Sequence, residues 1–241
     1  MEDAVYDRMN DLELRHWWFV ARRRIIAALI GRVLGQRPAR ILEAGCGSGG
    51  NLQMLRGFGE VDAFEFYGPA RESADRKTGM VIPFGALPDA LPFAGSTYDL
   101  IGLFDVLEHI QDDVGSLVAL RERLGEGGKI LVTVPALPFL WSGHDVRHHH
   151  FRRYTAASLS EVARKAGLKV TYSSYFNFFL FPMAVAARGV KRLTGSEVPD
   201  DRMPAGWLNA FLARIFGSER HLLGRIRLPI GLSLTAVLEK A

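Results

Sequence analysis

The segment EAGCGSGG, residues 43–50, constrains the fold of this chain more than any other feature. It follows residues 40–43, whose apolar character predicts a short buried strand, and it precedes a helix through Leu52 and Leu55. Glycines are needed between such a strand and helix when a ligand must approach the backbone, because side chains would block it. The segment therefore predicts an α/β fold with a ligand-binding loop.

Strand and helix patterns alternate along most of the chain. Alternation of this kind predicts right-handed crossovers and a mostly parallel sheet with helices on both faces. We therefore expect an α/β, Rossmann-like fold with a seven-stranded sheet. The expected strands are residues 40–43, 61–65, 80–83, 98–104, 129–134, 168–175 and 233–239.

The alternation stops near Phe176, which suggests how the single expected domain, residues 1–241, is organised. A segment of some fifty residues is too long for a hairpin loop, so we expect a helical insertion. Its apolar face and many arginines predict either helices packed on the sheet edge or a lid that touches anionic lipid. The expected parts are an N-terminal helical extension (1–37), a cofactor-binding core (38–175), the insertion or lid (176–227) and the last strand (228–241).

Composition excludes several classes of protein. The single cysteine, Cys46, excludes a disulfide framework and suits a reducing cytosol. Acidic residues near the start argue against a signal peptide, and the longest apolar stretch, 175–187, is shorter than the roughly 20 residues that span a bilayer. We expect a cytoplasmic protein, with peripheral contact at the inner face of the membrane as an open alternative.

The charge of the chain does not indicate nucleic acid. A net charge of +4 is mild, so no nucleic-acid partner is expected, and the sequence does not indicate an oligomeric state. Two local basic clusters, residues 22–24 and 147–153, stand out from this background. Each is either a solvated face or an anion-binding group.

Two cofactor classes fit the glycine loop. Gly45, Gly47 and Gly50 satisfy the dinucleotide pattern G-x-G-x-x-G, and Glu65 follows Gly45 by 20 residues, where a carboxylate can bind ribose hydroxyls. Glu43 distinguishes the two classes. Its carboxylate would repel a pyrophosphate but would stabilise the sulfonium and ammonium of S-adenosylmethionine. The residues therefore favour adenosylmethionine over NAD.

Further motifs extend this interpretation. Residues 43–49 resemble the E/D-x-G-x-G-x-G motif of class I adenosylmethionine-dependent methyltransferases of the type 11/23 kind, and residues 91–93, 98–101, 105–109 and 124–135 are similar to the superfamily's later blocks. The resemblance implies that Gly45 and Gly47 contact the methionine part, Glu65 the ribose and Phe66 an adenine face. The full cofactor set that we predict is Glu43, Gly45, Cys46, Gly47, Gly49, Asn51, Glu65, Phe66, Leu87, Phe104 and Asp105. One departure is Ala86, where many relatives have an acid.

Asp105, Glu108 and His109 follow the expected fourth strand. One interpretation is that the two acids cap a helix and His109 packs near the sulfonium. The other is a divalent metal site, because the spacing resembles that of metal-dependent small-RNA 2′-O-methyltransferases and ubiquinone-pathway O-methyltransferases. In that case His144 or His148 would be a fourth ligand. We favour an acid–base role for His109 and predict no metal.

A second cluster, residues 141–154, follows the fifth strand and contains four histidines together with arginines and aromatic residues. It is either a solvated basic loop or a loop that binds an anionic or aromatic substrate. We favour the substrate loop, with His109, His144 and His148 as candidate bases. The sequence thus predicts methyl transfer to a small-molecule acceptor, with oxygen as the favoured nucleophile. A non-catalytic binding protein and an NAD-dependent oxidoreductase are the alternatives.

Overall fold

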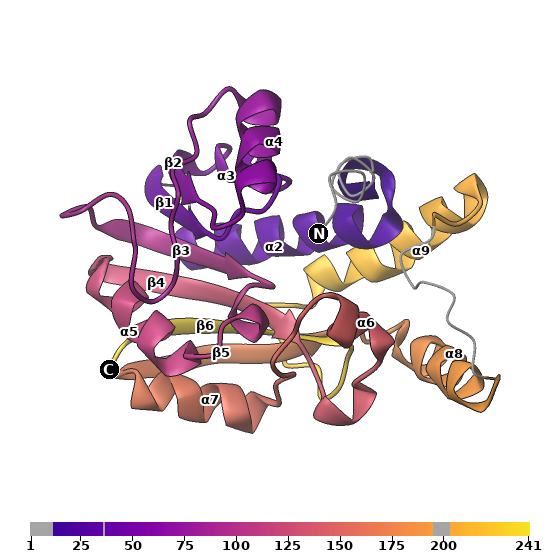
Figure 1. Ribbon diagram of the computed structural model, residues 1–241. Coiled ribbons are helices and arrows are strands. Elements are labelled where there is room, and N and C mark those ends of the chain that lie inside the picture. The colour runs from indigo at the N-terminus through magenta and orange to yellow at the C-terminus, as the bar shows by residue number, and fades with distance from the viewer. Residues whose placement is uncertain (1–11, 36, 195–202) are drawn as a thin grey trace.

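The computed structural model describes residues 12–35, 37–194 and 203–241. Its described part contains a six-stranded sheet with the order β2-β1-β3-β4-β6-β5 (Figure 1). The first four strands of this order are parallel, and β6 runs antiparallel to both of its neighbours. The strands are β1 (Ala39–Ala44), β2 (Gly59–Phe64), β3 (Tyr98–Phe104), β4 (Leu124–Pro135), β5 (Leu168–Phe176) and β6 (Ser233–Lys240).

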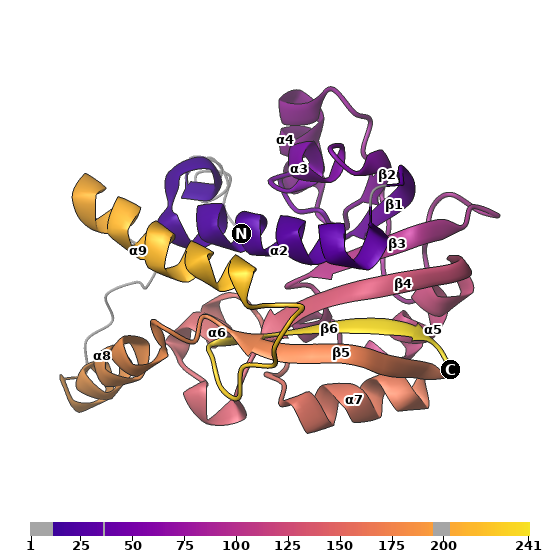
Figure 2. The same cartoon turned by 180° about the vertical axis from the view of Figure 1, so that it is seen from behind.

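Helices cover both faces of the sheet, as the alternating pattern predicts (Figures 1 and 2). The helices α2 and α9 lie on one side, and α5 and α7 lie on the other. The remaining helices lie around the edges of the sheet. The bounds are α2 (Trp17–Leu34), α3 (Leu52–Leu55), α4 (Gly68–Thr78), α5 (Asp113–Glu122), α6 (Gly143–Arg147), α7 (Ala156–Lys165), α8 (Phe181–Thr194) and α9 (Gly206–Ser218).

Successive residues of the central strands belong to different hydrophobic cores. Ile41 and Leu100 pack with the apolar side of α2, whereas their neighbours Leu42 and Ile101 belong to the core that contains residues of α5 and α7. This follows from the two-residue period of a strand, which points alternate side chains to opposite faces. Both cores are needed because parallel strands are buried on both faces.

The seventh strand that we expected at residues 80–83 is absent from the described structure, and the sheet has six strands. Two backbone positions of this segment cannot donate a hydrogen bond to a neighbouring strand. Pro83 has no N–H group, and the N–H of Ile82 donates to the Asp75 carboxylate at 2.8 Å. Only a single bridge, Glu65 with Phe84, connects the segment to the sheet edge.

The insertion packs against the N-terminal helix. Asn209 of α9 accepts a hydrogen bond from the Trp17 N–H at 2.8 Å and donates to the Arg15 carbonyl at 2.8 Å. The ring centroids of Trp17 and Phe216 are 5.9 Å apart. Residues 195–202 of the insertion lie outside the described residues. Among those described, no helix has the length and apolar character to cross a membrane.

Candidate active site

The glycine loop follows the carboxyl end of β1. Gly45, Gly47 and Gly49 have φ values of 75°, 55° and 81°, a region that other L-residues rarely adopt. A Cβ atom on Gly45 would lie 2.9 Å from Val106 Cγ2, and one on Gly49 would lie 3.1 Å from Ala74 Cβ. No described atom lies within 4 Å of the corresponding position on Gly47. The loop therefore packs tightly at its two ends and faces open space at its middle.

Two carboxylates flank this loop. Glu43 is 1% exposed, and its Oε1 accepts a hydrogen bond from Asn51 Nδ2 at 2.8 Å, whereas its buried Oε2 has no hydrogen-bond partner among the described residues. Burial raises the pKa of Glu43 to about 8. Glu65 is oriented across the loop, because it accepts hydrogen bonds from the N–H groups of Gly47 at 2.9 Å and Tyr67 at 2.8 Å.

The other predicted cofactor residues lie around the same end of the sheet. Cys46 is buried, and burial raises the pKa of its thiol. Phe66 is 65% exposed, and its ring centroid lies 5.8 Å from that of Phe84. Leu87 is half-buried, and Phe104 is buried at the end of β3. An exposed ring next to Glu65 offers an apolar face to a planar ligand group.

Arg22, on α2, extends into this site from the face of the sheet that α2 covers. It is buried, forms an ion pair with Asp105 and donates a hydrogen bond to Thr133 Oγ1 at 3.1 Å. Its guanidinium carbon lies 5.1 Å from the centroid of the Trp18 ring. From the sequence, residues 22–24 were treated as one basic cluster, either a solvated face or an anion-binding group. The signal that separates Arg22 from its neighbours is its position on the buried stripe of α2, one residue from Ala21 and three from Ile25.

The predicted catalytic histidines come together with a fourth histidine. His109 lies in the 3₁₀ turn η1 (Leu107–His109), and its ring centroid is 4.6 Å from that of His150. The rings of His144 and His148 are 4.2 Å apart, and His148 lies 6.0 Å from His150. His150 therefore joins the two groups, although its position in the sequence indicates no individual role.

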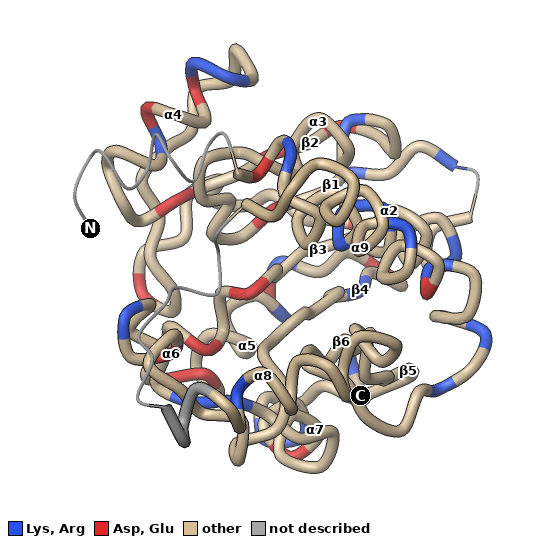
Figure 3. The backbone as a smooth tube through the Cα atoms, turned by 90° about the vertical axis from the view of Figure 1, so that its right-hand side faces the viewer, with Lys and Arg blue, Asp and Glu red and all other residues tan. Residues whose placement is uncertain are grey.

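Asp145 holds this cluster in place through its contacts with His150 and Arg153. It is fully buried, it accepts hydrogen bonds from Arg153 Nε at 2.7 Å and Arg153 Nη2 at 3.0 Å, and it lies 2.9 Å from His150 Nδ1. Burial alone would raise the pKa of Asp145, but the hydrogen bonds with His150 and Arg153 outweigh it and hold the pKa well below its usual range. Acidic and basic segments accordingly lie side by side around α6 (Figure 3).

Glu108 and His109 are adjacent but differ in exposure, because Glu108 is buried whereas His109 is exposed. Glu108 is 1% exposed, and burial together with the nearby Asp105 raises its pKa well above the ordinary value. Desolvation of its ring by neighbouring groups, with His150 as the next contribution, lowers the pKa of His109 to about 4, so its ring is neutral at pH 7. The site thus buries the carboxyl groups of Glu43 and Glu108 close to the buried cation Arg22, whose charge acts on both, and the buried Arg153 also acts on Glu108. Such a site favours a cationic ligand.

Residues 16–173 match the protein family described as a methyltransferase domain, which is well over half of the chain. The chain belongs to that family. Membership confirms the predicted resemblance to adenosylmethionine-dependent methyltransferases, and the structure confirms the Rossmann-like fold, with one strand fewer than expected. The match ends before the insertion that contains α8 and α9.

Known proteins similar to this chain include a malonyl-[acyl-carrier protein] O-methyltransferase from Pseudescherichia vulneris, which is 27% identical over 148 residues. That similarity spans 58% of this chain and 59% of the relative. A solved complex between the Haloferax volcanii Trm112 methyltransferase activator and its methyltransferase partner has a similar fold, with a TM-score of 0.63, 19% identity, and coverage of 98% of this chain and 94% of that chain.

A third comparison concerns a protein crystallised with a cofactor. The O-methyltransferase NcsB1 from neocarzinostatin biosynthesis, in complex with S-adenosylmethionine and 2-hydroxy-5-methyl naphthoic acid, matches with a TM-score of 0.52 and 20% identity. The match covers 84% of this chain and 49% of that chain. At 19% and 20% identity, the two solved structures show only that they share the fold of this chain.

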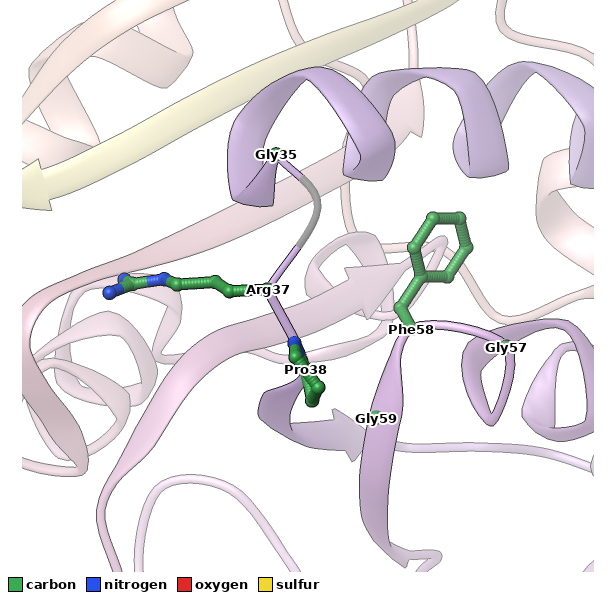
Figure 4. A pocket seen from close by; sticks show the side chains of 6 residues that line it. All are labelled: Gly35, Arg37, Pro38, Gly57, Phe58 and Gly59. Carbon is green, nitrogen blue, oxygen red and sulfur yellow. The ribbon is translucent and has the colours of Figure 1, made fainter.

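The protein also has surface pockets at the opposite edge of its sheet (Figure 4). They lie beside the amino ends of β1 and β2, whereas the glycine loop follows the carboxyl end of β1. Ligands of parallel α/β sheets bind at the carboxyl edge, so these pockets are separate from the candidate active site. The first is lined by Gly35, Arg37, Pro38, Gly57, Phe58 and Gly59.

Proposed function

We propose that this protein transfers the methyl group of S-adenosylmethionine to an oxygen atom of a small acceptor that is hydrophobic or anionic. The observation that carries the proposal is the open Gly47 between two carboxylates, Glu43 and Glu65, at the carboxyl edge of the sheet. The Oε2 of Glu43, which has no hydrogen-bond partner in the described part of the chain, favours a cationic ligand over the pyrophosphate of a dinucleotide.

Each loop residue then has a role in binding the cofactor. Gly47 leaves the backbone open to the methionine part, Gly45 forms the tightly packed start of the same turn, and Glu65 accepts hydrogen bonds from the ribose hydroxyls. The exposed ring of Phe66 covers one face of the adenine. Asp105, at the end of β3, lies near the donor end of the cofactor. When bound, the sulfonium supplies the methyl group, and the chain supplies alignment and a path for the acceptor's proton.

The histidine cluster supplies candidates for the proton acceptor. A base works best when its pKa is near the working pH, and the pKa of His109, about 4, makes its ring a weak base at pH 7. We therefore assign this role to His144 or His148, which lie close together at α6. An oxygen acceptor is also supported by the similarity to a protein named as an O-methyltransferase.

Ligand binding tests the proposal directly. We expect calorimetry to detect binding of adenosylmethionine and adenosylhomocysteine and to detect none, or far weaker binding, of NAD. Glu65→Ala should weaken adenosylhomocysteine binding by about 1–3 kcal/mol, because hydrogen bonds to a charged group are lost. Glu60→Ala is the matched control, since Glu60 is exposed on the preceding strand β2. Tighter binding of NAD than of adenosylhomocysteine would contradict the proposal.

We further propose that the insertion, residues 176–227, forms a lid over the acceptor opening and contacts anionic membrane surfaces. Apolar side chains remain exposed on it, with Trp207 75%, Met183 55% and Phe211 55% exposed. The insertion also carries several arginines, and mixed apolar and cationic surfaces bind anionic lipid headgroups.

Flotation with liposomes tests the membrane contact. We expect the protein to float with vesicles that contain anionic phosphatidylserine or phosphatidylglycerol and to bind neutral phosphatidylcholine vesicles weakly. Trp207→Ser should weaken vesicle binding at least about tenfold, because burial of a large apolar side chain in lipid is worth about 1.5–3 kcal/mol. Val81→Ser, at an 89% exposed position outside the insertion, is the control. Equal flotation of all three proteins, or none with either lipid, would exclude this surface.

A further inference from the structure

Three ligand-type side chains converge beside the cofactor loop. Glu108 and His109 come from η1, after the carboxyl end of β3, and His150 comes from the segment that follows α6. Each offers one ligand atom, and these three atoms lie within 4.8 Å of one another. Ligands about 2.1 Å from a common ion are separated by at most about 4.2 Å, so small side-chain movements would close the set around one ion.

A second observation indicates that a ligand is missing from this cluster. Glu108 is 1% exposed, yet its buried Oε2 has no hydrogen-bond partner among the described residues. A buried carboxylate oxygen without a partner is costly, and native structures normally satisfy such atoms. A cation bound between Glu108 and the two imidazoles would satisfy it.

The imidazole of His150 is oriented as metal-binding imidazoles usually are. Its Nδ1 lies 2.9 Å from Asp145 Oδ1, and an ionised carboxylate can only accept, so Nδ1 carries the hydrogen. The lone pair of His150 is therefore on Nε2. Metal-ligating histidines almost always use their second nitrogen in this way, and the carboxylate partner is itself fixed here by Arg153.

The backbone holds the two segments of the cluster together. The N–H of Phe151 donates to the carbonyl of Glu108 at 2.8 Å, and Arg152 donates to the carbonyl of Gln111 at 2.8 Å. His109 in turn makes a hydrogen bond to the backbone of His148. The ligand atoms of the cluster are thus positioned by contacts that do not depend on an ion.

We propose that Glu108, His109 and His150 bind one divalent transition-metal ion, with Asp145 as the residue that positions His150. Two imidazoles and a carboxylate suit zinc, iron, cobalt or manganese better than magnesium or calcium, which prefer oxygen ligands. Three protein ligands leave a coordination position open for an acceptor oxygen. This last role rests on the proposed function; the binding of the ion does not.

The ligand set differs from the one that the sequence suggested. Asp105 is engaged in an ion pair with Arg22 and is not a member of the cluster. His150, which had no predicted role, takes the place that His144 or His148 would have had. The sequence favoured a site without a metal, so this proposal departs from that prediction.

Cobalt is the probe for the test. Chain freed of metal with a chelator is titrated with Co²⁺ and followed by visible absorption, and Zn²⁺ is then added as a competitor. We expect one equivalent of Co²⁺ per chain and its displacement by zinc. Glu108→Gln and His150→Ala should each weaken binding at least about 100-fold. Asp145→Asn should weaken it about 10–100-fold, the range typical of residues that orient a ligand.

His149→Ala is the matched control, because His149 is an exposed neighbour outside the cluster. Its binding of Co²⁺ should equal that of the wild type, as should that of a His144→Ala, His148→Ala double variant. Binding that survives Glu108→Gln and His150→Ala but fails in the double variant would overturn the proposed ligand set. Absence of stoichiometric Co²⁺ and Zn²⁺ binding would overturn the site itself.

Adenosylhomocysteine binding, measured on the same samples, separates this proposal from the proposed function. Metal binding without adenosylhomocysteine binding would uphold the metal site and contradict the methyltransferase proposal. The opposite result would refute the metal site alone.

Discussion

Replacing Gly47 by alanine should weaken adenosylhomocysteine binding at least about 100-fold while the protein stays folded. Gly47 has a φ of 55°, which costs an alanine roughly 1–2 kcal/mol of stability. A Cβ atom there would meet no described atom within 4 Å, so the protein itself does not clash with it. The new methyl group would instead occupy the space that the cofactor needs next to the loop backbone. Calorimetry and urea denaturation measure the two effects separately.

Gly79→Ala is a closely matched control for this experiment. Gly79 ends α4 with a φ of 66°, and again no described atom lies within 4 Å of the position that a Cβ atom would take. Both variants therefore carry a similar backbone penalty, but only Gly47 lies in the glycine loop. Equal adenosylhomocysteine binding by the two variants would contradict the placement of the cofactor at Gly47.

Local patterns in the sequence were sufficient to predict the glycine loop and most of the sheet. The loop is encoded within eight residues, and its flanking acid Glu65 was found from its spacing. The start of α7 is likewise encoded locally, because the Thr155 side chain accepts a hydrogen bond from the Ser158 N–H as a helix cap. The missing strand at 80–83 shows the limit of such patterns, because an edge segment forms a strand only if its backbone groups can pair.

The site residues that sequence patterns do not reveal depend on contacts between distant segments. Arg22 pairs with Asp105, which follows β3, and with Thr133 of β4, and nothing within the sequence near Arg22 indicates those partners. Asp145 and His150 are close in sequence, and both lie in the predicted substrate loop. Their pairing was not predictable because it depends on how the chain turns after α6, which a single sequence does not specify.

Removal of Asp145 should have the largest effect on stability. We expect Asp145→Ala to lower the free energy of unfolding by about 3–5 kcal/mol, because it leaves the buried guanidinium of Arg153 without its carboxylate. The pKa of Asp145 is held below its usual range, so its stabilisation is present at neutral pH and is lost as the pH falls through the folded-state pKa. The difference between wild type and variant should therefore shrink below about pH 4. Urea denaturation at several pH values measures it.

Two further variants separate the buried ion pair from other causes of instability. Glu161→Ala removes one partner of the exposed pair Glu161–Arg164, whose atoms are 2.7 Å apart, and should leave the urea midpoint almost unchanged. Asp145→Leu combined with Arg153→Met removes both buried charges and should be less destabilised than Asp145→Ala, because no charge is left without a partner. If the double variant is instead as unstable as Asp145→Ala, the penalty does not come from the unpaired charge of Arg153. The hydrogen bonds of Asp145 to Ser142 and His150 would then be its source.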